Sequence, residues 1–591
     1  MMFRLKFLLL VLTASTVFGA DDFTTRAHLF LERIADRQQP ADFAIVTAQL
    51  RTGRHVESAR RQLDSLLRHP TGDMFYMYAS MGCLIAAYDS LPQIVRDQFR
   101  NVWKTYTFYR GDTENHFLMY YAGLLLATQE WPGLAGNEWF NGKSSDENAH
   151  EAREYLMQWI DTVARKGLVE FDSPRYLYYQ ITPLILLQEC SSDSIVKVRA
   201  ELMLDYLFAD FAVDYLHGSY TGAHSRDGES SSIEPNTAEA ISYAGLYFGD
   251  VDVERPLQDL AFAALSNYRL PEIIRELAFS SNIVHRESRR ARTHIRFGGE
   301  QEPMVLKYNF KTSEFALGSL EGTVVQPIQQ RSWSLIFNSA YLQNKTHQQN
   351  SVFALHPTHS ARELGTFFPE ELGLLVGDIG KAKTGYASED KWIGGSFSER
   401  IRQEKNVLVA LYDIPGDDPV NHIDYFIPSD LDSIERDESG WIFLKLGPCY
   451  GGIYPLRPFD WMITEGSHVR VRSYSRRNGY VVVAGSNRLR PQIKNYTAFK
   501  NELRHAVIDT NEFATKCAVT VHVGNRAAWR ASFNDPPPAD SSLFSDSEFS
   551  YLRSAKSTAP HISSERGSGV IEISRPGETL ILDFVRNEIR H

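Results

Sequence analysis

Two different hydrophobic periods divide the chain. From about Asp21 to Arg290, apolar residues recur at i, i+3, i+4 and i+7 in segments that short polar or Gly/Pro-containing loops separate, which is the pattern of amphipathic and buried helices. After about Thr293, short β-branched and aromatic runs such as 406–414 and 480–486 are bounded by turn residues. The chain is therefore predicted to be helical first and all-β second.

The predicted helices are of two kinds. Segments 146–167 and 193–213 carry charges on one face and apolar residues on the other, as outer helices do. Segments 115–129, 174–190 and 235–249 are apolar or small nearly all round, so they are predicted to be buried inner helices. Alternating inner and outer helices with short connections favour an (α/α) toroid, and an irregular helical array or solenoid is the alternative.

The many short strands of the second half have no helices between them, which indicates antiparallel sheets and most simply a large β-sandwich. The predicted organisation is a signal peptide at 1–20, an (α/α) toroid at 21–295 and an antiparallel β-sandwich region at 296–591. The fold class is thus a multidomain protein, α first and then β.

Residues 1–20 have the composition of a secretory signal peptide. Arg4 and Lys6 precede an apolar run, and the small residues Gly19 and Ala20 follow it. The run has about a dozen residues, fewer than the roughly 20 that span a bilayer, which disfavours the alternative of an uncleaved anchor. We expect an exported protein, periplasmic or extracellular, that has no membrane association after cleavage.

Composition narrows the classes of function. The chain has 591 residues and a formal net charge of −11, which argues against a dedicated nucleic-acid-binding protein. A Gly-rich nucleotide loop, a G-x-S-x-G elbow and an H-E-x-x-H motif are missing from the sequence, so no cofactor is expected. His356 and His359 have an H-x-x-H spacing, but no Cys or acidic partner is fixed nearby, and no metal is predicted.

In a toroid, the inner helices run the same way, so their N-terminal ends gather on one rim. The first polar helix start lies in 107–123, where Asp112 or Thr113 is the predicted N-cap. It places Glu114, Asn115 and His116 in the first turn, where free backbone N–H groups and the helix dipole favour anions. An Asn beside a His can hold a substrate carboxylate and exchange a proton; the alternative is that both only complete the helix start.

The second polar helix start lies in 169–183. Asp172 or Ser173 caps it, Pro174 follows, and Arg175 and three tyrosines come within two turns: Tyr176, Tyr178 and Tyr179. A phenol, with a pKa near 10, needs a cation to act as a base but donates a proton without one, and Arg175 is a candidate for that cation. Aromatic packing under the rim is the alternative for each tyrosine.

The third element is a long polar loop, 215–236, which precedes the next inner helix. Polar loops of this length inside a compact helical array usually have a function. His224 is favoured as a proton-transfer group and Arg226 as a carboxylate clamp. The loop also presents other polar side chains, with solvated decoration as the alternative: His217, Tyr220, Asp227, Glu229 and Glu234.

These features together resemble the polysaccharide lyases of the alginate, chondroitin, hyaluronan and heparinase type. The resemblance implies an acidic polysaccharide substrate and β-elimination at a uronate, without a cofactor. Carried onto this chain, Asn115 and Arg226 would neutralise the carboxylate and His116 or His224 would be the base. Tyr178 or Tyr179 would be the acid, with Tyr220 as a rival, and the residues expected to bind substrate are Arg175, Tyr220, Glu114 and Glu234.

Two other functions remain open. A toroidal glycoside hydrolase needs two carboxylates about 5 to 10 Å apart. The candidates on this rim are Asp112, Glu114, Asp227, Glu229 and Glu234. A non-catalytic glycan-binding envelope protein would use the aromatic residues of the rim as a sugar platform. The sequence does not fix the uronan, its sulfation, endo or exo action, or the oligomeric state.

Overall fold

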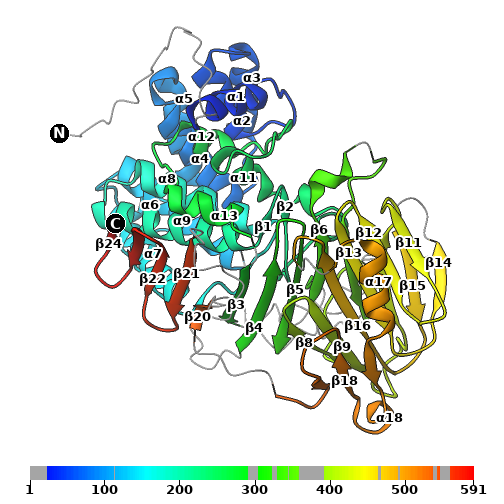
Figure 1. The fold of residues 1–591 in the computed structure, drawn as a ribbon. Coiled ribbons are helices and arrows are strands. Elements are labelled where there is room, and N and C mark those ends of the chain that lie inside the picture. The colour runs from blue at the N-terminus through cyan, green and yellow to red at the C-terminus, as the bar shows by residue number, and fades with distance from the viewer. Residues whose placement is uncertain are drawn as a thin grey trace.

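The computed structural model describes residues 23–111, 113–281, 283–290, 304–322, 329–343, 345–358, 392–463, 468–489, 493–536, 542–545 and 560–591. Helices make up the first half of the chain and antiparallel sheets the second, as the change of hydrophobic period predicts (Figure 1). The predicted signal peptide lies outside the described residues. Within them, no helix is both long enough and apolar enough to cross a bilayer.

The helical half is a ring. Its inner helices contact one another in a closed cycle, in the order α2 (Phe43–Thr52), α4 (Met74–Ala86), α6 (Glu114–Glu130), α8 (Tyr176–Cys190) and α12 (Leu260–Leu265), which returns to α2. Helices packed around this cycle are α1 (Phe23–Ala35), α3 (Val56–Arg68), α5 (Gln93–Thr105), α7 (Ser145–Lys166), α9 (Ser194–Val213) and α13 (Glu272–Phe279). The shorter helical elements of this half are η1 (Tyr88–Ser90), η2 (Gly136–Glu138), α10 (Glu229–Ile233), η3 (Pro235–Thr237) and α11 (Ile241–Tyr247). The closed cycle is the predicted toroid.

Burial separates inner from outer helices largely as predicted. In α6 every residue from Phe117 to Thr128 is buried, and α8 is equally enclosed. In α7 a capping box of Ser144 and Glu147 opens the helix, and one apolar face carrying Trp159 is buried. The predicted inner helix 235–249 is broken into η3 and α11, and all of α11 is buried.

The prediction that 193–213 is an amphipathic outer helix is wrong for its second half. In α9 every residue from Leu202 to Val213 is buried. The helix packs against α8 on one side and against α13, β23 (Glu578–Asp583) and β24 (Glu588–Arg590) on others. Its outer face therefore has no contact with solvent over these residues, because elements later in the chain cover it.

The β half contains a 13-stranded and a six-stranded antiparallel sheet in the described residues. The large sheet contains β3 (Ile283–Arg290), β4 (Met304–Lys311), β5 (Phe315–Gly322), β6 (Trp333–Phe337), β7 (Ser351–Leu355), β10 (Ile423–Pro428), β14 (Asp460–Ile463), β15 (His468–Ser473), β20 (Ser542–Ser545), β21 (His561–Glu565), β22 (Val570–Arg575), β23 and β24. The smaller sheet contains β8 (Glu399–Glu404), β9 (Val407–Asp413), β11 (Ser433–Arg436), β12 (Ile442–Leu446), β13 (Cys449–Pro455) and β16 (Arg477–Ser486). Residues from both sheets, such as Leu335 and Val482, share one buried cluster, which is the core of the predicted sandwich.

Smaller elements complete the chain. A two-stranded ribbon of β1 (Tyr215–Leu216) and β2 (Ser219–Tyr220) lies in the long loop of the helical half. In the β half they are η4 (Ser339–Leu342), α17 (Tyr496–Arg504), α18 (Phe513–Lys516), and a three-stranded sheet of β17 (Val507–Asp509), β18 (Ala518–His522) and β19 (Trp529–Ser532).

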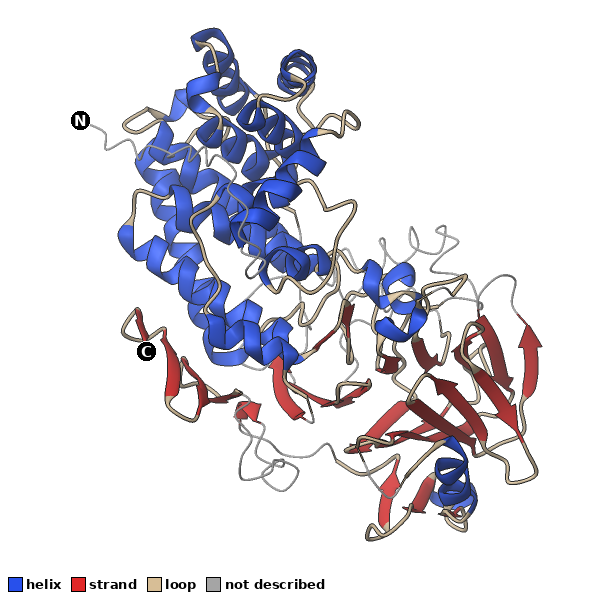
Figure 2. Cartoon of the chain, turned by 45° about the horizontal axis from the view of Figure 1, so that its top comes forward, coloured by secondary structure: helices blue, strands red, loops and turns tan. Residues whose placement is uncertain are grey.

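The C-terminal strands return to the helices. Figures 1 and 2 show β22 to β24 beside the helical ring, away from the sandwich. Ile573, Leu582 and Phe584 belong to the same buried cluster as the helical core. Arg199 of α9 donates hydrogen bonds to the Phe584 carbonyl and to Asn587 Oδ1 at 3.2 and 2.6 Å. The last strands of the chain therefore stabilise the first half.

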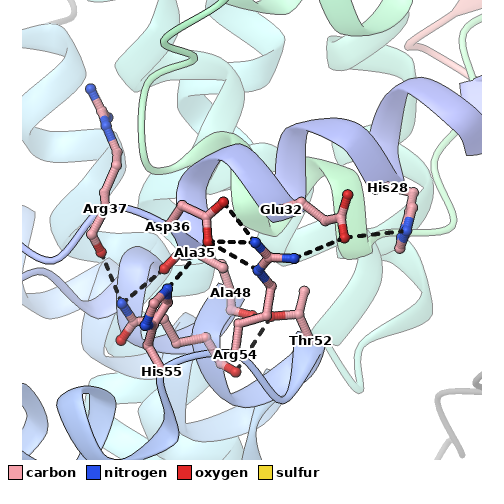
Figure 3. A network of polar contacts seen from close by, with 10 residues as sticks. His28, Glu32, Ala35, Asp36, Arg37, Ala48, Thr52, Arg54 and His55 are labelled. Atoms are coloured by element: carbon pink, nitrogen blue, oxygen red, sulfur yellow. Dashed lines mark hydrogen bonds and ion pairs between the residues drawn. The ribbon is translucent and has the colours of Figure 1, made fainter.

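A polar network joins α1 to the connection between α2 and α3 (Figure 3). Arg54 follows the left-handed Gly53 that ends α2, and it donates to Asp36 at 2.7 Å and to Glu32 at 3.2 Å. His55 lies 3.2 Å from the same Asp36 carboxylate. These side chains are all more than a third exposed, so water and salt screen each pair and the network adds little stability. The network thus links the end of α1 to the α2–α3 connection.

Candidate active site

The starts of three inner helices meet on one rim of the ring. Phe75, in the first turn of α4, packs edge-to-face against His116 of α6, with 5.6 Å between ring centroids. The same ring packs edge-to-face against Tyr179 of α8 at 5.1 Å. Phe75 thus contacts both His116 and Tyr179, which are 63 positions apart in sequence, as expected if the starts of the inner helices gather on one rim.

Asn115 is fully buried and anchored to Glu170. Its backbone N–H and its Nδ2 donate to Glu170 Oε2 at 3.1 and 2.6 Å, so Glu170 also caps the start of α6. The second amide hydrogen is directed at Thr113 Oγ1, 3.0 Å away. A carboxylate only accepts hydrogen bonds, which fixes Nδ2 toward it. Both amide hydrogens are thereby used, and Oδ1 is buried without a hydrogen-bond partner in the described part of the chain.

The Glu170 carboxylate links Asn115 to Arg226. Glu170 is fully buried, and its Oε1 pairs with Arg226 Nη1. Arg226 Cζ lies 3.9 Å from the centroid of the Tyr176 ring, a cation–π contact. Burial lowers the pKa of Arg226, but Glu170 and Tyr176 outweigh this effect and hold the pKa above its ordinary value. The clamp predicted at Arg226 is thus a charged guanidinium on an aromatic face.

The sequence places Tyr176 at this helix start together with Tyr178 and Tyr179 but assigns it no catalytic role. Tyr176 and Tyr179 are both half-buried, with ring centroids 6.5 Å apart. Residues three apart lie on one face of a helix, whereas Tyr178 points to a different side. Helical periodicity within residues 173–179 would have placed Tyr176 and Tyr179 on one face of the helix and Tyr178 on another.

The two candidate acids differ in access. Burial, with a contribution from Asp259, raises the pKa of Tyr179 to about 12, while Arg175 acts in the opposite direction. Tyr179 therefore keeps its proton at neutral pH and is a donor. Tyr178 is 2% exposed, packs against Tyr243 at 5.3 Å, and has no hydrogen-bond partner for its hydroxyl among the described residues. Tyr178 is a core residue in this structure.

Glu114 holds a loop in place. Its Oε2 accepts from the backbone N–H groups of Val169 and Glu170 at 2.9 and 2.8 Å, and its Oε1 accepts from Trp159 Nε1 at 3.1 Å. The side chain is buried, and these three bonds occupy both oxygens. The structure thus places Glu114 behind the rim, fixing the backbone that carries Glu170.

Tyr220 and His224 lie at the junction between helices and sheet. Both are buried, and the Tyr220 hydroxyl donates to Asp172 Oδ1 at 3.3 Å. His224 Nδ1 donates to the Asp172 carbonyl oxygen at 2.6 Å, and its backbone pairs with Arg331 in an isolated β-bridge. Burial, reinforced by nearby cations, holds the pKa of His224 far below its ordinary value. In this conformation the imidazole is neutral and has no access to solvent.

Arg175 and Glu234 each have a polar partner in another segment of the chain. The Arg175 side chain is 57% exposed, and its Nε lies 3.5 Å from Glu239 Oε1. Burial raises the pKa of Glu239, which is half-buried. Glu234 accepts a hydrogen bond from Gln349 Nε2 at 3.1 Å, so it links the polar loop to the β half.

The histidines of the β half do not form a metal site in the described residues. His356 is buried between Ser396 Oγ, 2.8 Å from Nδ1, and the Val420 carbonyl, 3.0 Å from Nε2. His359 lies outside the described residues. Throughout the part of the chain that the structure describes, no group of three His, Cys, Asp or Glu side chains could hold a metal ion.

The structure therefore brings together His116, Tyr176, Tyr179 and Arg226, which we call the rim site, with Asn115 and Glu170 behind it. Tyr178, Tyr220 and His224 are at most 2% exposed, whereas the Arg226 side chain keeps 10% of its surface exposed. Glu170 carried no signal in the sequence, because a single Glu in a loop is ordinary and its partners are 55 and 56 residues away.

No family model and no curated protein matches the sequence. Among solved structures, the chain is similar to heparinase III, with 9% identity and a TM-score of 0.39 over 83% of this chain and 82% of that one. It is similar to the chondroitin AC lyase of Streptomyces coelicolor A3, with 11% identity and a TM-score of 0.42 over 97% and 93% of the two chains. It is also similar to a Paenibacillus xanthan lyase, with 9% identity and a TM-score of 0.36 over 95% and 63%. All three of these solved structures are polysaccharide lyases.

Proposed function

We propose that the protein is an exported polysaccharide lyase that cleaves a uronic-acid-containing polysaccharide by β-elimination. The observation that carries this proposal is the rim site, where a charged guanidinium, an imidazole and a protonated phenol come from three separate segments of the ring. The proposal that it is exported rests on the signal-peptide pattern of residues 1–20.

Each group has a role in the elimination. The Arg226 guanidinium pairs with the uronate carboxylate and stabilises the charge that develops there as the C5–H bond breaks. His116 takes the C5 proton, the electron pair of that bond forms the C4–C5 double bond, and the C4–O4 bond breaks. Tyr179 gives its proton to O4. His116 and Tyr179 then regain their starting states by proton exchange with solvent.

Asn115 has a supporting role in this scheme. The sequence suggested that it neutralises the carboxylate, but both of its amide hydrogens are directed at Glu170 and Thr113. Asn115 instead fixes the Glu170 carboxylate that holds Arg226. The same guanidinium lies over the Tyr176 ring.

A glycoside hydrolase is less well supported. Of its candidate carboxylates, Glu114 accepts three hydrogen bonds, and Asp227 accepts from Gly228, Ser231 and Ser232. Both are therefore engaged in holding loops. Asp112 and the side chain of Glu229 lie outside the described residues.

The test is turnover of a polymer panel. Protein lacking residues 1–20 is incubated with alginate, glucuronan, chondroitin, hyaluronan and heparin, and both ultraviolet absorbance of an unsaturated uronate and new reducing ends are followed. Equal growth of the two signals with one polymer is expected. Reducing ends without absorbance would establish hydrolysis instead, and retention of a polymer without either signal would establish a binding protein.

A further inference from the structure

One strand of the large sheet presents three polar side chains to the helical half. Lys307, Asn309 and Lys311 alternate along β4, and each is at most 2% exposed. The residues between them, Tyr308 and Phe310, belong to the buried cluster of the sandwich. Because successive side chains of a strand point to opposite faces, the three polar residues lie on the other face, where they contact the helical half. β4 therefore meets the helices through buried polar contacts.

Lys307 holds two segments of the helical half together. Its Nζ donates to Asp214 Oδ2 at 2.6 Å and pairs with Asp172 Oδ2, and neither carboxylate has exposed side-chain surface. Asp214 follows the end of α9, whereas Asp172 lies in the loop before α8. Burial removes water from these charges, so each carboxylate depends on the ammonium and on its hydrogen bonds for compensation. Lys307 thus fixes the position of Asp172 relative to Asp214.

Asp172 lies in a turn that is joined to the segment carrying Arg226. Both residues are in the left-handed region, with φ of 44° for Asp172 and 50° for Arg226. Residues other than glycine keep this conformation where surrounding contacts hold it. The Asp172 carbonyl accepts from His224 Nδ1 at 2.6 Å, and Ser173 Oγ donates to the Arg226 carbonyl at 3.0 Å. The two left-handed residues are therefore linked through adjacent hydrogen bonds.

The same turn orients the start of α8. Ser173 Oγ accepts from the backbone N–H of Tyr176 at 3.1 Å, which satisfies one of the free donors at the start of the helix. Tyr179 lies one turn further along, so its direction follows from the way the helix begins. A shift of this turn would move the proposed acid and the guanidinium relative to each other.

We propose that Lys307 is a positioning residue of the rim site: by holding the turn at Asp172, it sets Tyr179 in place against Arg226. The ammonium contacts neither of these two functional groups, and it acts through the backbone that carries them. The β half is then required for the geometry of a site whose side chains all come from the helical half. This inference rests on the proposed lyase function.

Replacing Lys307 by Met tests the role of the ammonium. The substitution keeps an unbranched apolar side chain and leaves Asp172 and Asp214 facing each other without a counter-charge. We expect kcat to fall about tenfold or more with the polymer that the wild type cleaves, because a misplacement of about 1 Å can cost up to about 10²-fold. Each variant is assayed at a temperature at which circular dichroism shows it folded.

Lys311→Met is the matched control. Lys311 lies on the same face of β4 and donates to three backbone carbonyls of the helical half at 2.9 to 3.3 Å. Its loss should lower the thermal midpoint, as that of Lys307 does, but should change kcat less than about threefold. Equal losses of kcat in the two variants, or a kcat of Lys307→Met within about threefold of the wild type, would overturn the inference.

A second substitution separates positioning from general damage to the interface. Asn is uncharged and adopts the left-handed region more readily than most residues, so Lys307→Met with Asp172→Asn should recover at least about threefold of the lost kcat. A double variant without recovery would overturn the role of the turn. If Lys307→Met does not fold, Asp172→Ala takes its place: a kcat about threefold or more below the wild type supports the inference, and an unchanged kcat overturns it.

Hydrogen exchange separates this inference from the proposed function. If no polymer is cleaved, the lyase proposal fails, and amide exchange in residues 172–180 and 224–228 then decides whether Lys307 holds the turn. Faster exchange there in Lys307→Met than in Lys311→Met supports the positioning role. Equal exchange in the two variants overturns it.

Discussion

Replacing Glu170 by Ala tests the polar core behind the rim site. Glu170 is fully buried, pairs with Arg226, and accepts from the backbone N–H and Nδ2 of Asn115. The substitution leaves the Arg226 side chain, only 10% exposed, without its counter-charge. Breaking a buried ion pair from one side costs about 3 to 5 kcal/mol, and the lost hydrogen bonds to Asn115 are part of the same cost.

This magnitude is large enough to measure by thermal unfolding. For a unit of about 150 to 250 residues, each kcal/mol shifts the midpoint by about 2 to 4 °C, so Glu170→Ala should lower it by about 6 to 20 °C. Far-ultraviolet circular dichroism follows the helical half directly. Glu57→Ala is the control, since Glu57 is 73% exposed in its pair with Arg60 and should cost less than about 1 kcal/mol.

A double variant separates the ion pair from general damage to the loop. Glu170→Ala with Arg226→Met removes both charges, so it should be more stable than Glu170→Ala alone. A midpoint for Glu170→Ala within about 2 °C of the wild type would refute the reasoning about the buried pair. A double variant no more stable than the single one would show that the charge of Arg226 is not what the carboxylate stabilises.

Three further predictions follow from other regions. Tyr179→Phe should lower turnover by about 10²- to 10⁴-fold, as expected for loss of a general acid. The control Tyr178→Phe should change turnover less than about threefold. Comparable losses in both variants would contradict the assignment of Tyr179 as the acid. Burial raises the pKa of Glu399 to about 7 from 4.5, so its stabilising contribution is complete below about pH 4.5 and is lost as the pH rises through about 7. Glu399→Gln should flatten the thermal midpoint over that range, and an unchanged slope would contradict this origin. Deleting residues 560–591 exposes apolar surface of α9 and should give insoluble or partly unfolded protein, so a soluble helical half with the wild-type midpoint would show that the last strands do not stabilise it.

Hydrophobic period predicted the order of the two halves, the inner helices α6 and α8, and the ring that brings His116 near Tyr179. These features follow from the spacing of apolar residues along each helix, which is a property of the local sequence. The burial of α9 could not be predicted in this way, because β23 and β24 come from more than 350 residues later. The apolar residues of α9 are compatible both with a helix that is exposed on one face and with a helix that is buried all round.

The candidate site also combines features that the local sequence predicts with features that only the fold determines. Local sequence placed polar residues at helix starts, and ring geometry brought those starts together. Which tyrosine faces the rim follows from helical rotation, and which carboxylate holds Asn115 and Arg226 depends on the path of a loop that no periodicity describes. Glu170 is a single residue between two helices, and only the folded chain shows that it is fully buried against both partners.

Cleavage in ¹⁸O-labelled water is the most direct test of β-elimination. Elimination moves a proton to O4 and forms a C4–C5 double bond without adding water, whereas hydrolysis adds one water across the glycosidic bond. Mass spectrometry of the oligosaccharides released from a cleaved uronan should therefore show unsaturated ends without labelled oxygen introduced at the broken bond. Saturated products that carry one ¹⁸O per cleavage would contradict elimination and identify the protein as a hydrolase.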